Sequence, residues 1–207
     1  MAAPVPPTLG LVLAGGLARR MGGGDKARIT ISGVTILERV LACLEPQCTN
    51  LVINANGDPA RFADTKLPVV ADSVPDFAGP LAGILAGLDW AALHLPECEW
   101  VASVPADCPF LPNDLVARLH AARAAAGAPL SCARSGKWRH PVVGLWPLAL
   151  RDDLRRVFRS IDVKEWIDRL GRPIGDRDAM TRRPDFDLAK TFGDKRPAQI
   201  ISQRERP

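Results

Sequence analysis

Glycines and cations alternate between residues 15 and 26, a segment that we call the glycine loop. Its glycines stand at positions 15, 16 and 22–24, and its cations are Arg19, Arg20 and Lys26. Glycine lets a backbone approach a ligand closely, and backbone N–H groups together with cations bind phosphate. The loop therefore predicts a phosphate-binding site, with a glycine-rich surface loop that binds nothing as the alternative.

Two common phosphate-binding motifs do not match the glycine loop. A P-loop places Ser or Thr directly after its lysine, where this chain has Ala27. A dinucleotide-binding fingerprint has the spacing G-x-G-x-x-G, whereas Gly15 and Gly16 are adjacent. The loop therefore belongs to neither of these classes.

Three polar side chains follow apolar segments that are typical of buried strands: Asn54, Asp72 and Asp107. Ligands of an open parallel sheet bind beyond the carboxyl ends of its strands, so we expect these residues to share a site with the glycine loop. A carboxylate beside phosphates is repelled unless a cation lies between them. Asp107 therefore predicts a bound Mg²⁺, with a turn or helix-capping role before Pro109 as the alternative.

No nucleophile is paired with a base in the sequence. We expect His94 within a helix, His120 on a polar helix face and His140 before a proline, all in structural or solvated roles. Cys108 has no histidine near it in the sequence and is interpreted as a packing residue. A substrate that brings its own nucleophile is then required. Phosphoryl or nucleotidyl transfer meets this requirement, because its catalysis consists largely of positioning and charge neutralisation.

The composition is typical of a globular protein. Of 207 residues, 47% are hydrophobic, and the net charge of +4 suits anionic small molecules without requiring nucleic acid. The five cysteines show no C-x-x-C spacing, which favours reduced thiols in the cytoplasm. We also expect no signal peptide and no membrane span, because no apolar stretch approaches the roughly 18 residues that a bilayer requires.

Short apolar runs alternate along the chain with segments of helical periodicity. Strands are expected at residues 9–14, 51–54, 68–72, 100–104, 130–133 and 141–146, and helices at 34–44, from 80 onward, 111–126, 148–158 and 163–170. The alternation predicts an α/β fold, a single-domain, Rossmann-like, mostly parallel sheet with helices on both faces. We place the domain at residues 1–181 and expect a partly disordered tail at 182–207.

Two glycines interrupt the apolar face of the helix that begins at Pro80. Gly83 and Gly87 lie four residues apart, and each costs about 1 kcal/mol relative to alanine. We therefore expect a neighbouring strand, another backbone or a ligand to approach this face closely.

The segment Leu13–Lys26, LAGGLARRMGGGDK, resembles the L-A-G-G-x-x-x-R-M-G-x-x-D-K signature of the molybdenum cofactor guanylyltransferases. Further matches follow in the family's order: VINAN (52–56), DS (72–73), GPLAG (79–83), PADCP (105–109) and RHPV (139–142). Several motifs in one order make the resemblance, over residues 9–147, far more specific than a single glycine loop.

The resemblance implies a nucleotidyltransferase fold and a defined reaction. The family joins GMP from MgGTP to the terminal phosphate of molybdenum-bound molybdopterin, which releases pyrophosphate and forms the guanine dinucleotide cofactor. Carried over to this chain, the nucleotide-binding residues are Leu13, Ala14, Gly15, Lys26, Asn54, Asp72 and Asp107. The implied catalytic residues are Lys26, Arg20 and Asp107, of which Asp107 binds Mg²⁺.

The resemblance also implies the partners. They are GTP and molybdenum-molybdopterin, together with molybdopterin-synthesis proteins and the apo-molybdoenzymes that receive the cofactor, and neither nucleic acid nor a membrane. A turn at Arg139–His140 is implied to contact the pterin.

Three alternatives stay open. Cytidylyltransferases that make the cytosine dinucleotide cofactor typically have L-A-A-G, and Gly15 in place of that alanine leaves room for the larger purine. A nucleotidyltransferase could instead act on a sugar phosphate. The third is a relative that binds nucleotide without transferring it, because residues 184–191, PDFDLAKT, depart from the family's late N-[IV]-N-T-P segment.

Overall fold

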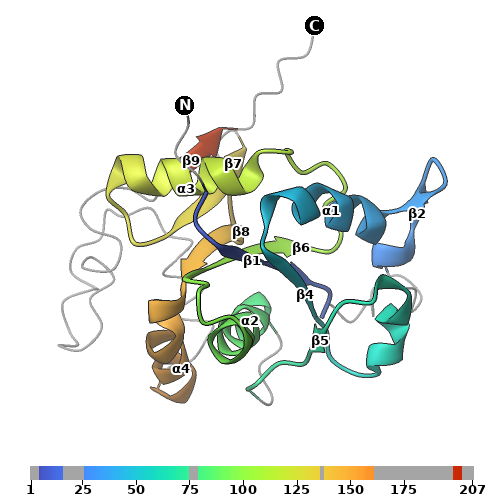
Figure 1. Ribbon diagram of the computed structural model, residues 1–207, viewed down its shortest axis with the longest axis horizontal. Helices are drawn as coiled ribbons and strands as arrows, with labels where there is room; N and C mark the ends of the chain where they lie inside the picture. Colours follow the sequence, from blue (N-terminus) through green and yellow to red (C-terminus); the bar gives the residue numbers. More distant parts are fainter. Residues whose placement is uncertain (1–4, 16–25, 75–78, 136–137, 161–197, 202–207) are drawn as a thin grey trace, which may run out of the picture.

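A computed structural model describes residues 5–15, 26–74, 79–135, 138–160 and 198–201. Its centre is a seven-stranded sheet with the order β5-β4-β1-β6-β8-β7-β9 (Figure 1). The strands are β1 (Thr8–Leu13), β4 (Asn50–Asn54), β5 (Val69–Val70), β6 (Trp100–Pro105), β7 (Ser131–Ser135), β8 (Trp138–Pro147) and β9 (Ala198–Ile201). Every strand expected from the sequence is present, and β9 is an addition within the segment expected to be a tail.

The sheet is mostly parallel, as predicted. The neighbouring strands β5, β4, β1 and β6 all run in the same direction. The long strand β8 runs antiparallel to β6 and β7, and β9 pairs with β7 in parallel. The carboxyl ends of the four parallel strands therefore meet at one edge of the sheet, where ligands bind in folds of this kind.

Helices cover both faces of the sheet, which confirms the predicted architecture. α1 (Ile36–Leu44) and α3 (Leu115–Ala126) lie on one face, and α2 (Pro80–His94) and α4 (Arg151–Ser160) lie on the other (Figure 1). Leu9 and Leu11 of β1 pack with α2 and α4, whereas Val12 packs with α1 and α3. Because β1 is buried on both faces, its residues after Thr8 form an uninterrupted apolar run.

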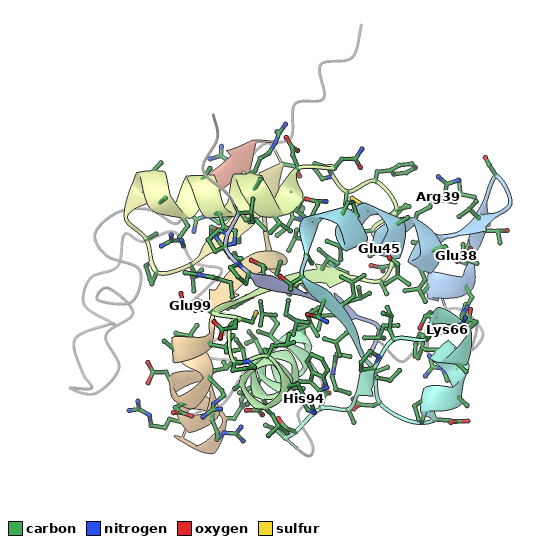
Figure 2. All side chains as sticks on the ribbon, in the orientation of Figure 1. Glu38, Arg39, Glu45, Lys66, His94 and Glu99 are labelled. Carbon is green, nitrogen blue, oxygen red and sulfur yellow. The ribbon has the colours of Figure 1, made fainter. Side chains whose placement is uncertain are left out.

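The helix expected at residues 34–44 begins two residues late, because Val34 and Thr35 form a strand. They make β3 (Val34–Thr35) and pair with β2 (Thr30–Ile31) in a short hairpin. Glu38 N donates to Thr35 Oγ1 over 3.1 Å and Thr35 N donates to Glu38 Oε2 over 2.7 Å, a capping box. The Thr35 hydroxyl, which donates to Glu38 Oε2 over 2.8 Å, and then the Thr35 N–H hold the pKa of Glu38 below its usual value. Figure 2 shows Glu38 at the end of α1 beside the hairpin.

The helix expected at residues 111–126 begins instead at Leu115, because Gln47 holds the segment before it. Gln47, in η2 (Glu45–Gln47), donates from Nε2 to Pro112 O over 3.2 Å and accepts from Val116 N at Oε1 over 3.0 Å. The first turn of α3 is thereby capped from another element.

Three further 3-10 helices complete the described elements: η1 (Lys26–Arg28), η3 (Pro59–Thr65) and η4 (Leu148–Leu150). The helix expected at residues 163–170 and the proposed boundary after residue 181 lie outside the described residues. Within the part of the chain that the structure describes, no helix is both long and apolar enough to span a bilayer.

Candidate functional site

The ends of β1, β4 and β6 lie side by side at the carboxyl edge of the sheet. In the strand register, Leu13 is opposite Asn54 on one side and Pro105 on the other. Ala14 N donates to Asn54 O over 2.8 Å, and Ala106 N donates to Leu13 O over 3.0 Å. The hydrogen bonds continue past the last strand residues, so the segments that carry the predicted site residues leave the sheet together.

Asn54 is the buried polar residue of this edge, with 3% of its surface exposed. Its Nδ2 donates to Val70 O over 3.2 Å and to Asp72 Oδ1 over 2.9 Å. The amide of Asn54 therefore joins the ends of β4 and β5 and contacts the Asp72 carboxylate.

Asp72 is half-buried and hydrogen-bonded at both carboxylate oxygens. Asn56 donates from Nδ2 to Asp72 Oδ2 over 2.7 Å and accepts from Asp72 N at Oδ1 over 2.9 Å. Asn56 lies in the matching segment VINAN, and its sequence context predicts no role for it. Its hydrogen bonds to Asp72 span sixteen positions, so no local sequence pattern indicates them.

Gly83 lies where α2 packs on this edge. A Cβ at residue 83 would stand 2.2 Å from Asn54 Oδ1 and 2.7 Å from Leu13 Cδ2. A Cβ on Gly87 would stand 2.5 Å from Leu11 Cδ2. The expected close approach to both glycines is therefore present, and it comes from side chains of the neighbouring strands β1 and β4.

Asp107 stands in the turn after β6, and it is exposed. A carboxylate is the hard oxygen ligand that Mg²⁺ prefers, and Mg²⁺ takes its other ligands largely from water and phosphate, so Asp107 fits the role predicted for it. The described residues contain no group of three or more His, Cys, Asp or Glu side chains that could hold a metal ion. Burial and the charge of Asp107 raise the pKa of the neighbouring Cys108 thiol, which agrees with a packing role.

The glycine loop itself lies largely outside the described residues. Residues 16–25, including Arg20, and the side chain of Lys26 are not among them. The structure describes how the chain returns from the loop: Ala27 is buried at 3% exposure, and Arg28 pairs with Asp64 of η3 over 2.5 Å. This pairing lowers the pKa of Asp64 and ties η1 to η3.

The histidines behave differently from one another. His94 contacts Trp90 O through Nδ1 over 2.9 Å, and His140 contacts Ser135 Oγ through Nε2 over 2.6 Å. The expectation that His120 lies on a polar helix face was wrong, because His120 is buried against β1 and β6 at 7% exposure. Its Nε2 lies 2.9 Å from Thr8 Oγ1, and Trp100 contacts its ring edge-on.

The segment expected to form a basic turn before His140 is partly strand. Arg139 and His140 belong to β8 and pair with Arg134 and Ala133 of β7. Since β8 is antiparallel to β6 and Ser103 pairs with Gly144, the start of β8 extends toward the edge that carries Asp107. Residues 136–137 lie outside the described residues.

Known proteins resemble this chain in sequence and in fold. The family model described as MobA-like NTP transferase domain matches residues 10–174. A molybdenum cofactor guanylyltransferase from Nitrobacter hamburgensis is 61% identical over 169 residues, which cover 82% of this chain and 80% of the relative.

Two solved structures show the same fold. Molybdopterin-guanine dinucleotide biosynthesis protein A from Archaeoglobus fulgidus has a TM-score of 0.59 at 20% identity and covers 78% of this chain and 79% of its own. A Mycobacterium tuberculosis protein in complex with manganese has a TM-score of 0.56 at 16% identity and covers 95% of this chain and 88% of its own.

The family match covers most of the chain, and the identity to the Nitrobacter relative extends over four fifths of both sequences. The sheet order, the helices on both faces and the polar strand ends agree with that assignment. This chain belongs to the molybdenum cofactor guanylyltransferases, which are nucleotidyltransferases with a MobA-like NTP transferase domain.

Proposed function

We propose that this protein transfers GMP from MgGTP to the terminal phosphate of molybdenum-molybdopterin, forming the guanine dinucleotide cofactor and pyrophosphate. The observation that carries the proposal is the register in which Leu13 stands between Asn54 and Pro105. It gathers the start of the glycine loop, the Asn54–Asp72 pair and the turn of Asp107 at one edge of the sheet. A nucleoside triphosphate bound there would contact all three.

Each end of the nucleotide has its own residues in this proposal. The segment Leu13–Gly15 contacts the nucleotide through its backbone, and Asn54 with Asp72 holds the guanosine part. Lys26 and Arg20 neutralise the triphosphate. Asp107 holds the Mg²⁺, which when bound offsets negative charge on the phosphates.

Transfer requires no nucleophile from the protein. An oxygen of the acceptor's terminal phosphate attacks the α-phosphorus of GTP, and the bond from that phosphorus to the bridging oxygen breaks. Pyrophosphate leaves with the electron pair, and Lys26 offsets its developing charge. The chain's residues therefore act by positioning and electrostatics, and Arg139 with His140 extends toward the acceptor side of the edge.

Guanine is the base that we assign to the site. Gly15 lies against Asn54, because a Cβ there would stand 3.6 Å from Asn54 Oδ1. The missing methyl group leaves this space free for a purine. The Nitrobacter relative is also named for guanylyl transfer, and we therefore prefer GTP to CTP and molybdopterin to a sugar phosphate.

We place the reaction in the cytoplasm, with molybdopterin-synthesis proteins and apo-molybdoenzymes as the protein partners. All five cysteines have free thiols, which is the state that the cytoplasm maintains. The net charge of +4 also suits two anionic substrates.

Pyrophosphate release tests the function directly. Purified protein with Mg²⁺ and molybdenum-molybdopterin should release pyrophosphate with GTP and not with CTP or ATP. Release with CTP but not GTP would contradict the assignment of guanine. Turnover with a hexose 1-phosphate but not with molybdopterin would favour the sugar-phosphate alternative, and GTP binding without turnover would favour a non-catalytic relative.

Asp107→Asn tests the metal role, because it keeps the size of the side chain and removes its charge. We expect the rate to fall at least about 100-fold. Asp114→Asn is the matched control and should keep the full rate, since Asp114 is an exposed carboxylate that pairs with Arg118, four residues further along the chain, over 2.7 Å. Near-normal turnover by Asp107→Asn would remove Asp107 from the metal site.

A further inference from the structure

Asn56 uses both ends of its side-chain amide on a single residue. Its Nδ2 donates to Asp72 Oδ2 over 2.7 Å, and its Oδ1 accepts from Asp72 N over 2.9 Å. Asn54 Nδ2 donates to the other carboxylate oxygen over 2.9 Å. Two asparagines therefore hold one carboxylate: Asn54 from the buried side and Asn56 from the solvent side.

These hydrogen bonds fix the plane of the carboxylate. A half-buried aspartate at the end of a strand would otherwise rotate about its side-chain torsions. A carboxylate oxygen accepts about two hydrogen bonds, so each oxygen of Asp72 keeps one position for a ligand. The arrangement is matched to a ligand with two neighbouring donors, which both the ribose diol and the guanine edge of GTP supply.

The fold does not need Asn56 to hold this segment. The ends of β4 and β5 are already joined by backbone hydrogen bonds, Ile53 N to Pro68 O and Ala55 N to Val70 O, each 2.9 Å. Asn54 also bonds to Val70 O. What Asn56 adds is confined to the backbone N–H and the carboxylate of Asp72. Gly57, with φ of +87°, turns the chain directly after it, and Arg61 donates to Asn56 O over 3.5 Å.

We propose that Asn56 is a positioning residue of the nucleotide site, which orients the Asp72 carboxylate toward two donors of the guanosine. The inference rests on the proposed function, because it takes GTP as the ligand of Asp72. Asn56 acts through Asp72 and need not touch the nucleotide, so its loss should weaken binding and leave the chemical step unchanged.

Two substitutions and one control test the inference in the full chain. Asn56→Ala removes both hydrogen bonds. Asn56→Asp puts a carboxylate against that of Asp72, and the two repel at high pH but share a proton at low pH. Asn50→Asp makes the same chemical change at an exposed position at the opposite end of β4. Calorimetry gives the Kd of MgGTP, pyrophosphate release gives KM and kcat, and thermal melting reports the fold.

We expect Asn56→Ala to raise Kd and KM about tenfold, with kcat within about twofold of wild type. Asn56→Asp should bind MgGTP more weakly than wild type at pH 8 and recover toward it at pH 5.5. The ratio of the Kd of Asn50→Asp to that of wild type should stay near one at both pH values. Binding should be compared with 2′,3′-dideoxy-GTP and ITP, since the analogue that loses the Asn56 effect identifies the donor pair.

Three results would overturn the inference. Wild-type affinity in both Asn56 variants would remove the residue from the site. A loss of affinity that only follows a loss of folded protein, without the recovery at low pH, would make Asn56 a structural residue. Failure of the wild-type protein to bind GTP would overturn the proposed function, and this inference with it.

Discussion

At the residue scale, Gly83 is the point where the packing of α2 and the site depend on each other. A methyl group there would collide with the amide of Asn54 at 2.2 Å and with Leu13 Cδ2 at 2.7 Å. Asn54 is buried and holds Asp72, so it can yield only by releasing that carboxylate. The glycine therefore protects the geometry of the nucleotide site as well as the core.

Gly83→Ala should lower the free energy of unfolding by about 1–3 kcal/mol, as overpacking does, and weaken GTP binding at least about tenfold. Gly87→Ala is the matched control on the same helix, because the three atoms nearest to its Cβ all belong to the side chain of Leu11, the closest 2.5 Å away. It should destabilise the protein and leave the Kd of GTP unchanged. Equal Kd values for the two folded variants would contradict this account.

At the element scale, Gln47 joins the end of α1 to the start of α3. Besides its bonds to Pro112 and Val116, its Nε2 donates to Cys43 O over 2.7 Å. Gln47→Ala should lower the free energy of unfolding by about 1–2 kcal/mol, because it leaves a helix N–H and a carbonyl without these partners. Urea denaturation measures the change. Gln47→Glu keeps the acceptor for Val116 N but places an oxygen against the carbonyls of Cys43 and Pro112, so it should also lose stability. Wild-type stability in both variants would contradict the capping role.

The burial of His120 between α3 and the sheet makes stability depend on pH. Burial, and then the nearby charge of Arg123, lower the pKa of His120 from 6.5 to about 4. The unfolded chain therefore takes up a proton at higher pH than the folded protein, so stability should fall as pH drops from 6.5 toward 4. The loss should reach about 3 kcal/mol at most.

Denaturation across this pH range tests the dependence on His120. His120→Gln keeps an N–H that can reach Thr8 Oγ1, and the glutamine side chain does not titrate. The variant should lose most of the fall in stability between pH 6.5 and 4. A slope equal to that of the wild type would show that other groups cause it.

At the scale of the whole molecule, the sequence predicts the parallel half of the sheet well, because strands buried on two faces are apolar throughout. It also places Asn54, Asp72 and Asp107 after strands, from which their common edge follows. Contacts between distant segments are not predicted, such as Asn56 with Asp72, Gln47 with Val116, and the burial of His120. The sequence around His120 does not indicate that the Thr8 hydroxyl lies against its ring.

Short elements and late strands are also missed. The hairpin of β2 and β3 has two residues in each strand, too few for a pattern of alternation. The strand β9 pairs with β7 across more than sixty positions, so nothing local indicates it. The roles of Lys26 and Arg20 stay predictions, since the side chain of Lys26 and all of Arg20 lie outside the described residues.

The central claim is that the ends of β1, β4 and β6 surround one metal-bound triphosphate. Paramagnetic broadening by Mn²⁺ in place of Mg²⁺, measured by NMR on labelled protein with GTP, tests it most directly. The account predicts GTP-dependent broadening of the amide signals of Gly15 and Asp107, while those of Thr8 and Trp100, at the opposite edge of the sheet, stay sharp. A sharp Asp107 signal beside a broadened Gly15 signal, or broadening at Thr8 and Trp100, would contradict it.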